Sequence, residues 1–184
     1  MKTLIAYYSF TDNNAKLAKH LQQQLNADIV RIETEKRRNG FSILLDLIFK
    51  RKPQLRALSL SLKDYDHIVL VAPIWAGKVA TPLKAFLVGE KQNIRSYSFV
   101  SLCGGGNPNQ LQDIQEEVSS VVQRAPLNVL ELWVNDLLPP EKRNTIKYTS
   151  GFRIEDNGFA LFQDQIQKFV RAERRVIEEP AQIE

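Results

Sequence analysis

The stretch TLIAYYSFTDNNAKLAKHL, residues 3–21, joins a strand pattern, a polar turn and a helix pattern. Its apolar run ends at Tyr8, and short hydroxyl and amide side chains follow between Ser9 and Asn14. Leu17 and Leu21 then fall four residues apart, as they would on the buried face of a helix. The stretch therefore predicts a β-strand, a loop and an α-helix, the first unit of an alternating α/β chain.

The rest of the chain repeats this alternation. Four further strand-like runs are DIVRIE (28–33), HIVLVA (67–72), YSFVSLC (97–103) and LNVLELWV (127–134). Helical spacing of apolar residues falls between or after them, at 41–49, 80–87, 111–122 and 159–170. HIVLVA is apolar throughout, as a central parallel strand should be, whereas 28–33 and 127–134 carry polar interruptions typical of edge strands. We predict a three-layer α/β sandwich with a five-stranded parallel sheet, and the pattern favours the order 2-1-3-4-5.

The length of 184 residues fits one domain. We expect that domain to span residues 1–172, with a C-terminal tail over 173–184. Residues 135–157 are polar and carry Pro139 and Pro140, which predicts a long surface loop.

The positive charge is modest and local. The chain has a net charge of +4, and residues 31–56 carry eight Lys or Arg side chains against three acidic ones, so this segment accounts for the whole excess. It is interpreted either as a solvated loop or as a patch that attracts phosphate, acidic proteins or an anionic membrane. No recognition motif accompanies it, so we expect no nucleic-acid partner. The apolar run at 41–49 is either a short buried helix or a surface for homodimer or membrane contact.

Cysteine and histidine usage argues against disulfide and metal chemistry. Cys103 is the single cysteine, which excludes an internal disulfide and suits a reducing compartment. No secretory signal and no apolar stretch of about 18–20 residues stands out, so we expect a cytoplasmic protein. His20 and His67 have no cysteine or carboxylate at metal-ligand spacing, and we expect structural roles for both and no metal site.

The loop after the first strand has the composition of an anion site. Hydroxyls, amides and the free N–H groups of a helix N-terminus can surround a phosphate without any lysine or arginine. Helix capping alone is the alternative, since it favours the same residue types. Capping needs one such residue, however, and most of the positions from Ser9 to Asn14 carry one.

Two more loops follow neighbouring strands. PIWAGKVATP (73–82) brings Trp75, either as a flat face for a planar ligand or as a core residue under the loop. CGGGNPN (103–109) has three glycines that let a ligand approach the backbone closely. In a sheet of order 2-1-3-4-5, a ligand binds beyond the carboxyl ends of the strands, between the first and third.

These motifs resemble the flavodoxin family. YYSFTDNNAKLA is similar to the family's phosphate loop, Ser/Thr-x-Thr-Gly-Asn-Thr. PIWAGKVATPLKAFL is similar to its flavin-ring loop, Pro-x-Trp/Tyr-x-Gly followed by Pro and Phe-Leu, and LCGGG resembles its third loop. The likeness runs from residue 1 to about 134 and then includes the last helix.

The resemblance implies FMN as the cofactor and assigns a role to each loop. It places the phosphate at Ser9, Thr11, Asn13, Asn14 and Ala15, and the flavin-ring wall at Pro73, Ile74, Trp75, Ala76 and Gly77. It makes Gly104, Gly105 and Gly106 the opposing backbone loop, with Cys103 close by. No catalytic residue is implied.

The resemblance also sets the functional expectation. We expect a flavodoxin-like flavoprotein, an oxidoreductase or electron-transfer protein that exchanges electrons or hydride through non-covalent FMN. Its partner would be a nicotinamide reductant or a redox protein. The alternative is a non-catalytic interaction module that has lost FMN, suggested by Asp12 in the position where the family has glycine. A receiver-type signalling domain is excluded, because acidic residues are missing at the ends of the first and third strands.

Overall fold

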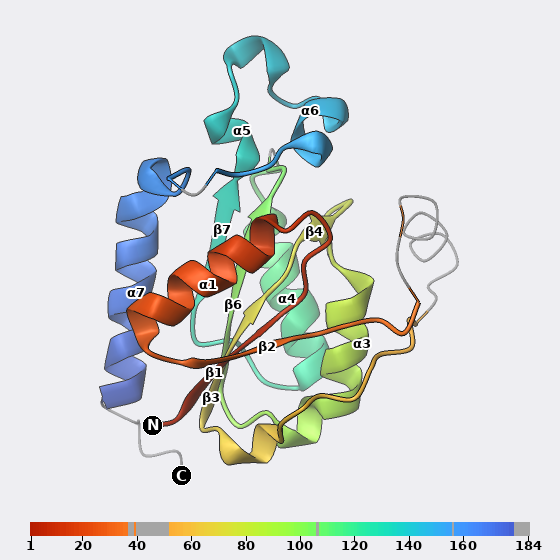
Figure 1. Ribbon diagram of the computed structural model, residues 1–184, viewed down its shortest axis with the longest axis vertical. Coiled ribbons are helices and arrows are strands. Elements are labelled where there is room, and N and C mark those ends of the chain that lie inside the picture. The colour runs from red at the N-terminus through yellow and green to blue at the C-terminus, as the bar shows by residue number, and fades with distance from the viewer. Residues whose placement is uncertain (37–38, 40–51, 106, 156, 179–184) are drawn as a thin grey trace.

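A parallel five-stranded sheet in the order β2-β1-β3-β6-β7 forms the centre of the molecule (Figure 1). The computed structural model describes residues 1–36, 39, 52–105, 107–155 and 157–178. The strands of this sheet are β1 (Thr3–Tyr7), β2 (Asp28–Arg31), β3 (His67–Val71), β6 (Tyr97–Cys103) and β7 (Val129–Trp133). The predicted order 2-1-3-4-5 is confirmed, since β4 (Ile74–Trp75) and β5 (Lys78–Val79) form a separate antiparallel hairpin after β3.

Burial of the strands follows the hydrophobic pattern of the sequence. Every residue of β1, β3 and β6 is buried, because these strands have neighbours on both sides and helices on both faces. β2 and β7 lie at the sheet edges and are partly exposed, which is where their polar residues are tolerated.

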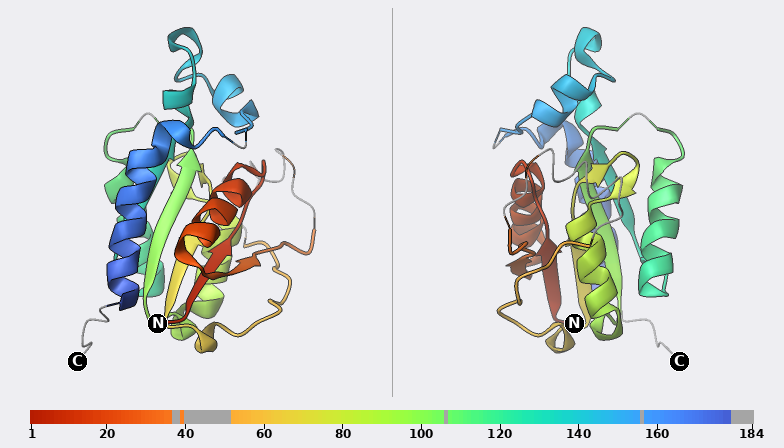
Figure 2. Two further views of the ribbon diagram at one scale, coloured as in Figure 1. Left: turned by 60° about the vertical axis from the view of Figure 1, so that its left-hand side comes forward. Right: turned by 90° about the vertical axis from the view of Figure 1, so that its right-hand side faces the viewer.

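Two pairs of helices cover the two faces of the sheet (Figure 2). α1 (Asn13–Leu25) and α7 (Gln163–Glu178) pack on one face, with Leu17, Leu21 and Ile166 in its core. α3 (Thr81–Glu90) and α4 (Gln110–Val122) pack on the other face, with Leu83 and Ile114 in that core. Each fully buried side chain of this size contributes roughly 1.5–3 kcal/mol, so the apolar spacing of these helices determines where they dock.

The segment between β7 and α7 is more ordered than a polar surface loop. It contains α5 (Val134–Leu137), a 3-10 turn at Pro140–Lys142, α6 (Ile146–Gly151) and a second 3-10 turn at Ala160–Phe162. The loop prediction for 135–157 is therefore wrong in part. The segment extends beyond the carboxyl edge of the sheet, at the top of Figure 1. Its helices are too short and too polar to show the periodicity of a buried face.

The boundary of the predicted tail is also wrong. α7 continues to Glu178, and Glu173 within it is fully buried, so the helix does not fray at 173. The described residues do not include the predicted helix at 41–49, Gly106, residues 179–184 and part of the basic segment 31–56. No helix in the described ranges is long and apolar enough to cross a membrane.

A buried polar network joins α7 to the sheet at the end opposite the three loops. His67 Nε2 lies 2.8 Å from Glu173 Oε2, and its Nδ1 lies 2.8 Å from Ser96 Oγ. Ser98 Oγ and Asn128 Nδ2 both donate to Glu173 Oε1, at 2.7 and 2.6 Å. Because both carboxylate oxygens are hydrogen-bonded, the network can remain in a fully buried place. His67 is structural, as the sequence predicted.

Candidate functional site

The three loops singled out in the sequence lie together at the carboxyl edge of the sheet. Tyr7 is level with Val71 in the ladder, and Val71 is level with Val100. The ladder continues one residue further, since Tyr8 N donates to Val71 O at 2.9 Å and Ala72 N donates to Val100 O at 3.2 Å. The loops after β1, β3 and β6 therefore start side by side.

The loop after β1 contains a buried hydroxyl and a helix start without a side-chain cap. Ser9 is 5% exposed, and its Oγ has no hydrogen-bond partner among the described residues. Asp12 is the N-cap of α1, with a positive φ of 63°, and its side chain makes no capping hydrogen bond. Thr11 is half-exposed and Ala15 is buried in the first turn. Capping alone does not explain this polar loop, because the residue in the cap position does not cap.

Asn13 and Asn14 do not present free amides to a ligand. Asn13 Nδ2 donates to Phe152 O and its Oδ1 accepts from Ile154 N, both at 2.9 Å. Asn14 Nδ2 donates to Leu102 O and its Oδ1 accepts from Leu102 N, also at 2.9 Å. The two side chains join the start of α1 to β6 and to the segment after α6. Their predicted part in phosphate binding is thereby reduced to their backbone N–H groups.

The loop after β3 is a tight hairpin that holds Trp75. Ala76 and Gly77, the two residues between β4 and β5, both have positive φ, 48° and 72°. Trp75 is half-buried and makes edge-on contacts with Tyr8 at 5.8 Å and Phe10 at 6.2 Å between ring centroids. Pro73 and Ile74 are half-buried beside it. Trp75 is thus partly packed and partly open, between the two alternatives that the sequence allowed.

The loop after β6 approaches two other segments closely. Asn135 N donates to Gly104 O at 3.2 Å, and a Cβ built on Gly104 would meet Thr149 of α6 at 3.5 Å. Gly105 has a φ of 82°, and a Cβ there would lie only 2.4 Å from Trp133 Cγ. This position needs glycine for both reasons.

Cys103 lies beneath this loop, and its thiol has low reactivity. It is 5% exposed. Burial, together with the negative charge of Glu131, raises the pKa of its thiol to about 12. The thiol therefore stays protonated at neutral pH and acts as a small packing group.

The segment after β7 borders the first and third loops. Besides its bonds to Asn13 and Gly104, it accepts a hydrogen bond from Lys16 Nζ at Ile154 O, 2.9 Å away. Tyr148 lies on α6, with its ring centroid 5.7 Å from the ammonium groups of both Lys142 and Lys147. This border was not predicted, because it depends on contacts across almost the whole length of the chain.

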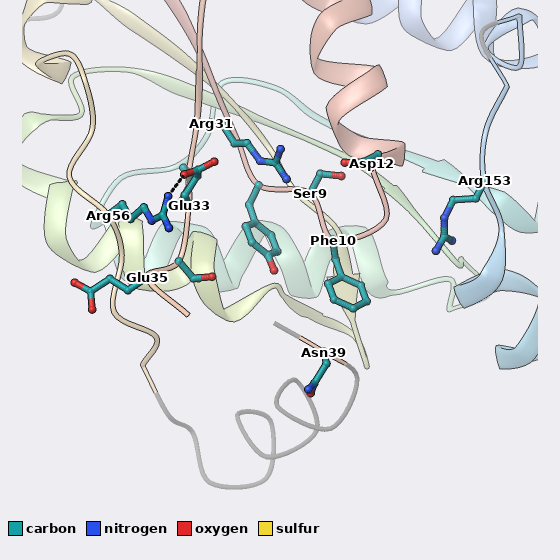
Figure 3. Close-up of a pocket in the computed structure, with 12 residues that line it drawn as sticks. Ser9, Phe10, Asp12, Arg31, Glu33, Glu35, Asn39, Arg56 and Arg153 are labelled. Carbon is teal, nitrogen blue, oxygen red and sulfur yellow. Dashed lines mark hydrogen bonds and ion pairs between the residues drawn. The ribbon is translucent and has the colours of Figure 1, made fainter. Parts of the chain in front are cut away.

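A pocket of about 780 Å³ opens beside the loop after β1, toward β2 (Figure 3). Three arginines in its wall, Arg31, Arg56 and Arg153, were not named as site residues, although two of them belong to the basic segment 31–56. Acidic side chains share the wall, and Arg56 pairs with Glu33 at 3.1 Å. The full lining is Tyr8, Ser9, Phe10, Asp12, Arg31, Ile32, Glu33, Thr34, Glu35, Asn39, Arg56 and Arg153.

The described part of the chain holds no group of three histidine, cysteine or carboxylate side chains placed to bind a metal ion. His20, the other histidine, stacks on Phe159 with 5.2 Å between ring centroids and an interplanar angle of 22°. Its Nε2 lies 2.7 Å from Gln24 Nε2, and burial lowers its pKa.

Solved flavoproteins share this architecture. A flavoprotein from Lactobacillus acidophilus, crystallised with FMN, matches with a TM-score of 0.62 at 18% identity, over 71% of this chain and 92% of that one. A candidate flavoprotein from Bacteroides eggerthii matches with a TM-score of 0.62 at 15% identity, over 90% of this chain and 98% of that one. The fold is flavodoxin-like. A flavone reductase matches more distantly, with a TM-score of 0.51 at 14% identity, over 100% of this chain and 64% of that one.

The likeness lies in the structure and not in the sequence. No protein-family model matches the chain, and no curated protein matches it significantly. At these identities only the fold is shared, and the chemistry of the three loops depends on the residues that they contain.

Proposed function

We propose that this protein binds FMN non-covalently at the loops after β1, β3 and β6 and acts as an oxidoreductase. The observation that carries the proposal is Ser9, a buried hydroxyl without a partner in the described chain, close to a helix start whose N-cap residue, Asp12, makes no capping hydrogen bond. A buried polar group is nearly always hydrogen-bonded, so an orphan at this place indicates a ligand acceptor. The Lactobacillus acidophilus flavoprotein of the same fold was crystallised with FMN, which supports the choice of ligand.

The phosphate group fits the loop after β1. Ser9 and Thr11 would donate from their hydroxyls, and Asn13, Asn14 and Ala15 would donate from the free N–H groups of the first helical turn. The side-chain amides of Asn13 and Asn14 keep this loop in place through their bonds to β6 and to residues 152–154.

The flavin ring fits between the other two loops. Trp75 would provide an aromatic wall, kept at its angle by Tyr8 and Phe10, with Pro73 and Ile74 behind it. The tight turn at Ala76 and Gly77 and the backbone of Gly104 and Gly105 would border the ring edge. Gly106 belongs to the same proposed loop, and Cys103 beneath it would contribute packing only.

When bound, FMN supplies a ring that accepts and releases one or two electrons. The chain's own part is to bind the phosphate, orient the ring and exclude water from one of its faces. A net charge of +4 differs from that of electron shuttles whose acidic faces attract basic partners. We therefore favour an enzyme that reduces a small acceptor, with a nicotinamide or a redox protein as the electron donor.

A second candidate is a flavodoxin-like interaction module without FMN. Two observations favour it. Asp12 places a carboxylate at the helix start, and the amides of Asn13 and Asn14 are already bonded to the backbone. In this case the buried Ser9 hydroxyl would remain without a hydrogen-bond partner, and the fold would bear that cost.

Reconstitution distinguishes the two candidates. The protein is incubated with excess FMN, desalted, and its flavin absorbance is compared with its concentration. We expect close to one FMN per chain for the wild type and a clear loss for Ser9→Ala. Thr3→Val is the matched control, because Thr3 Oγ1 is also buried without a partner in the described residues but lies at the other end of β1. A colourless wild type would favour the interaction module.

The same sample tests the electron donor. NADH or NADPH is added without oxygen, and the flavin absorbance is followed. Bleaching by either nucleotide identifies a reductase. A stable yellow colour with both would point to a protein donor.

A further inference from the structure

Arg31 is an exposed, charged side chain near the proposed phosphate loop, and it has no partner among the described residues. It is the last residue of β2, level with Tyr7 of β1, and it lines the pocket beside that loop. In the described part of the chain it makes no hydrogen bond or ion pair, whereas Arg56 in the same wall pairs with Glu33 at 3.1 Å. Figure 3 shows the guanidinium of Arg31 pointing from β2 in the direction of Ser9, which lines the same pocket.

Arg153 lies on the other side of the same loop (Figure 3). Its Nη1 donates to the carbonyls of Gly151 and Phe152, at 3.0 and 2.9 Å, and more weakly to that of Ser150 at 3.4 Å. These bonds fix the guanidinium at the end of α6. Phe152 is in turn bonded to Asn13, so the position of Arg153 is coupled to the start of α1.

The pocket wall also carries acidic side chains, whose negative charge would repel a phosphate unless the two arginines offset it. Glu33 is paired with Arg56, but Asp12 and Glu35 also line the wall. Asp12 is exposed and stands at the helix start where the phosphate would bind. A carboxylate there opposes a dianion, and a nearby guanidinium restores the balance and can donate two hydrogen bonds.

We propose that Arg31 and Arg153 bind the phosphate of the flavin together with Ser9 and make the site selective for FMN over riboflavin. This inference rests on the proposed function. The Ser9 hydroxyl, buried and without a partner among the described residues, indicates an acceptor at this point. The guanidinium of Arg31, exposed in the wall of the same pocket and unpaired within the described chain, supplies positive charge that suits an anionic acceptor. Recognition of the phosphate by charge would make FMN affinity depend on salt, whereas riboflavin affinity would not.

Dissociation constants for FMN and riboflavin test this, each measured by quenching of flavin fluorescence in low and high salt. We expect Arg31→Gln to weaken FMN binding on the order of tenfold and to leave riboflavin binding unchanged. Arg171→Gln is the matched control, because Arg171 is exposed on α7 and remote from the pocket. Inorganic phosphate should compete with FMN and not with riboflavin, which shows that the anion is the phosphate group itself.

Arg153 needs two variants, because Arg153→Gln also removes hydrogen bonds that fix the end of α6. Arg153→Lys keeps the charge, and we expect it to retain more FMN affinity than Arg153→Gln. Urea midpoints of all variants report whether the fold is intact. An unchanged ratio of the FMN and riboflavin constants in Arg31→Gln would overturn the inference. Equal wild-type affinity for both flavins would overturn it while leaving the proposed function standing, and a wild type that binds neither would overturn both.

Discussion

The side chain of Asn14 pairs with the backbone of Leu102 as a neighbouring strand would. Its Nδ2 donates to Leu102 O and its Oδ1 accepts from Leu102 N, each at 2.9 Å, and Asn14 is 2% exposed. One side chain thereby ties the first turn of α1 to the end of β6. Because the loop after β1 ends and the loop after β6 begins at this contact, it fixes the distance between two walls of the proposed site.

Replacing Asn14 should destabilise the fold. Asn14→Leu keeps the volume but leaves the buried N–H and carbonyl of Leu102 without their partner, which costs about 2–4 kcal/mol in the free energy of unfolding. Gln23→Ala, an exposed change on the same helix, should stay within about 0.5 kcal/mol of the wild type. Urea denaturation measures both. Equal midpoints for the two variants would contradict this role of Asn14.

Two glycines with similar φ angles should respond differently to a methyl group. Gly77→Ala, at a φ of 72° with open space around it, should cost about 1–2 kcal/mol from backbone strain alone. Gly105→Ala adds a clash with Trp133 and should cost about 1–3 kcal/mol more. The displaced indole should also change the tryptophan emission spectrum. A Gly105→Ala variant as stable as Gly77→Ala would show that Trp133 moves aside freely.

Cys103 should resist thiol reagents in the folded protein. Burial raises the pKa of its thiol to about 12, from an ordinary value of 9.0, and thiolate is the reactive form. At pH 8 the thiolate fraction falls on the order of a thousandfold, so labelling by a disulfide reagent should be slow in buffer and fast in urea. The rate in buffer should increase as the pH is raised toward the pKa. Fast labelling of the folded protein at pH 8 would contradict the assignment.

Removing the Asp12 carboxylate should strengthen FMN binding. A unit charge several ångströms from the phosphate costs about 1 kcal/mol in a solvent-exposed setting, equivalent to about fivefold in the dissociation constant. Asp12→Asn tests the charge alone. Asp12→Gly also relieves the positive φ of 63°, and it should raise the urea midpoint as well. Unchanged FMN affinity in both variants would place the phosphate away from this residue.

The central fold could be predicted because its signals are local and periodic. The apolar run at 67–72 and the polar interruptions at 28–33 and 127–134 distinguish buried from edge strands, and the strand order follows from that distinction. The loops after β1, β3 and β6 could be placed at one edge for the same reason. α6 could not be foreseen, because its residues are almost all exposed and have no apolar period.

The contacts within the site were less predictable than its location. Asn13 and Asn14 are residue types that suit a phosphate loop, yet their side-chain amides form hydrogen bonds with residues far along the chain. Arg31 belongs to the basic segment 31–56, for which phosphate attraction was one interpretation, but the sheet register decides that its side chain lines this pocket. Arg153 is brought there by the segment after β7 and has no sequence signal for this placement. Residue type suggests what a side chain can bind, but long-range packing decides whether it is free to do so.

Backbone amide NMR shifts during an FMN titration test the central claim most directly, because they report where the ligand binds. The largest changes should fall at residues 9–15, 74–79 and 103–107, on the loops after β1, β3 and β6. The amide chemical shifts should not change around the buried network at the other end of the molecule, at His67, Ser98 and Glu173. A spectrum that does not change at millimolar FMN, or changes confined to other surfaces, would contradict the proposal that these loops bind a flavin.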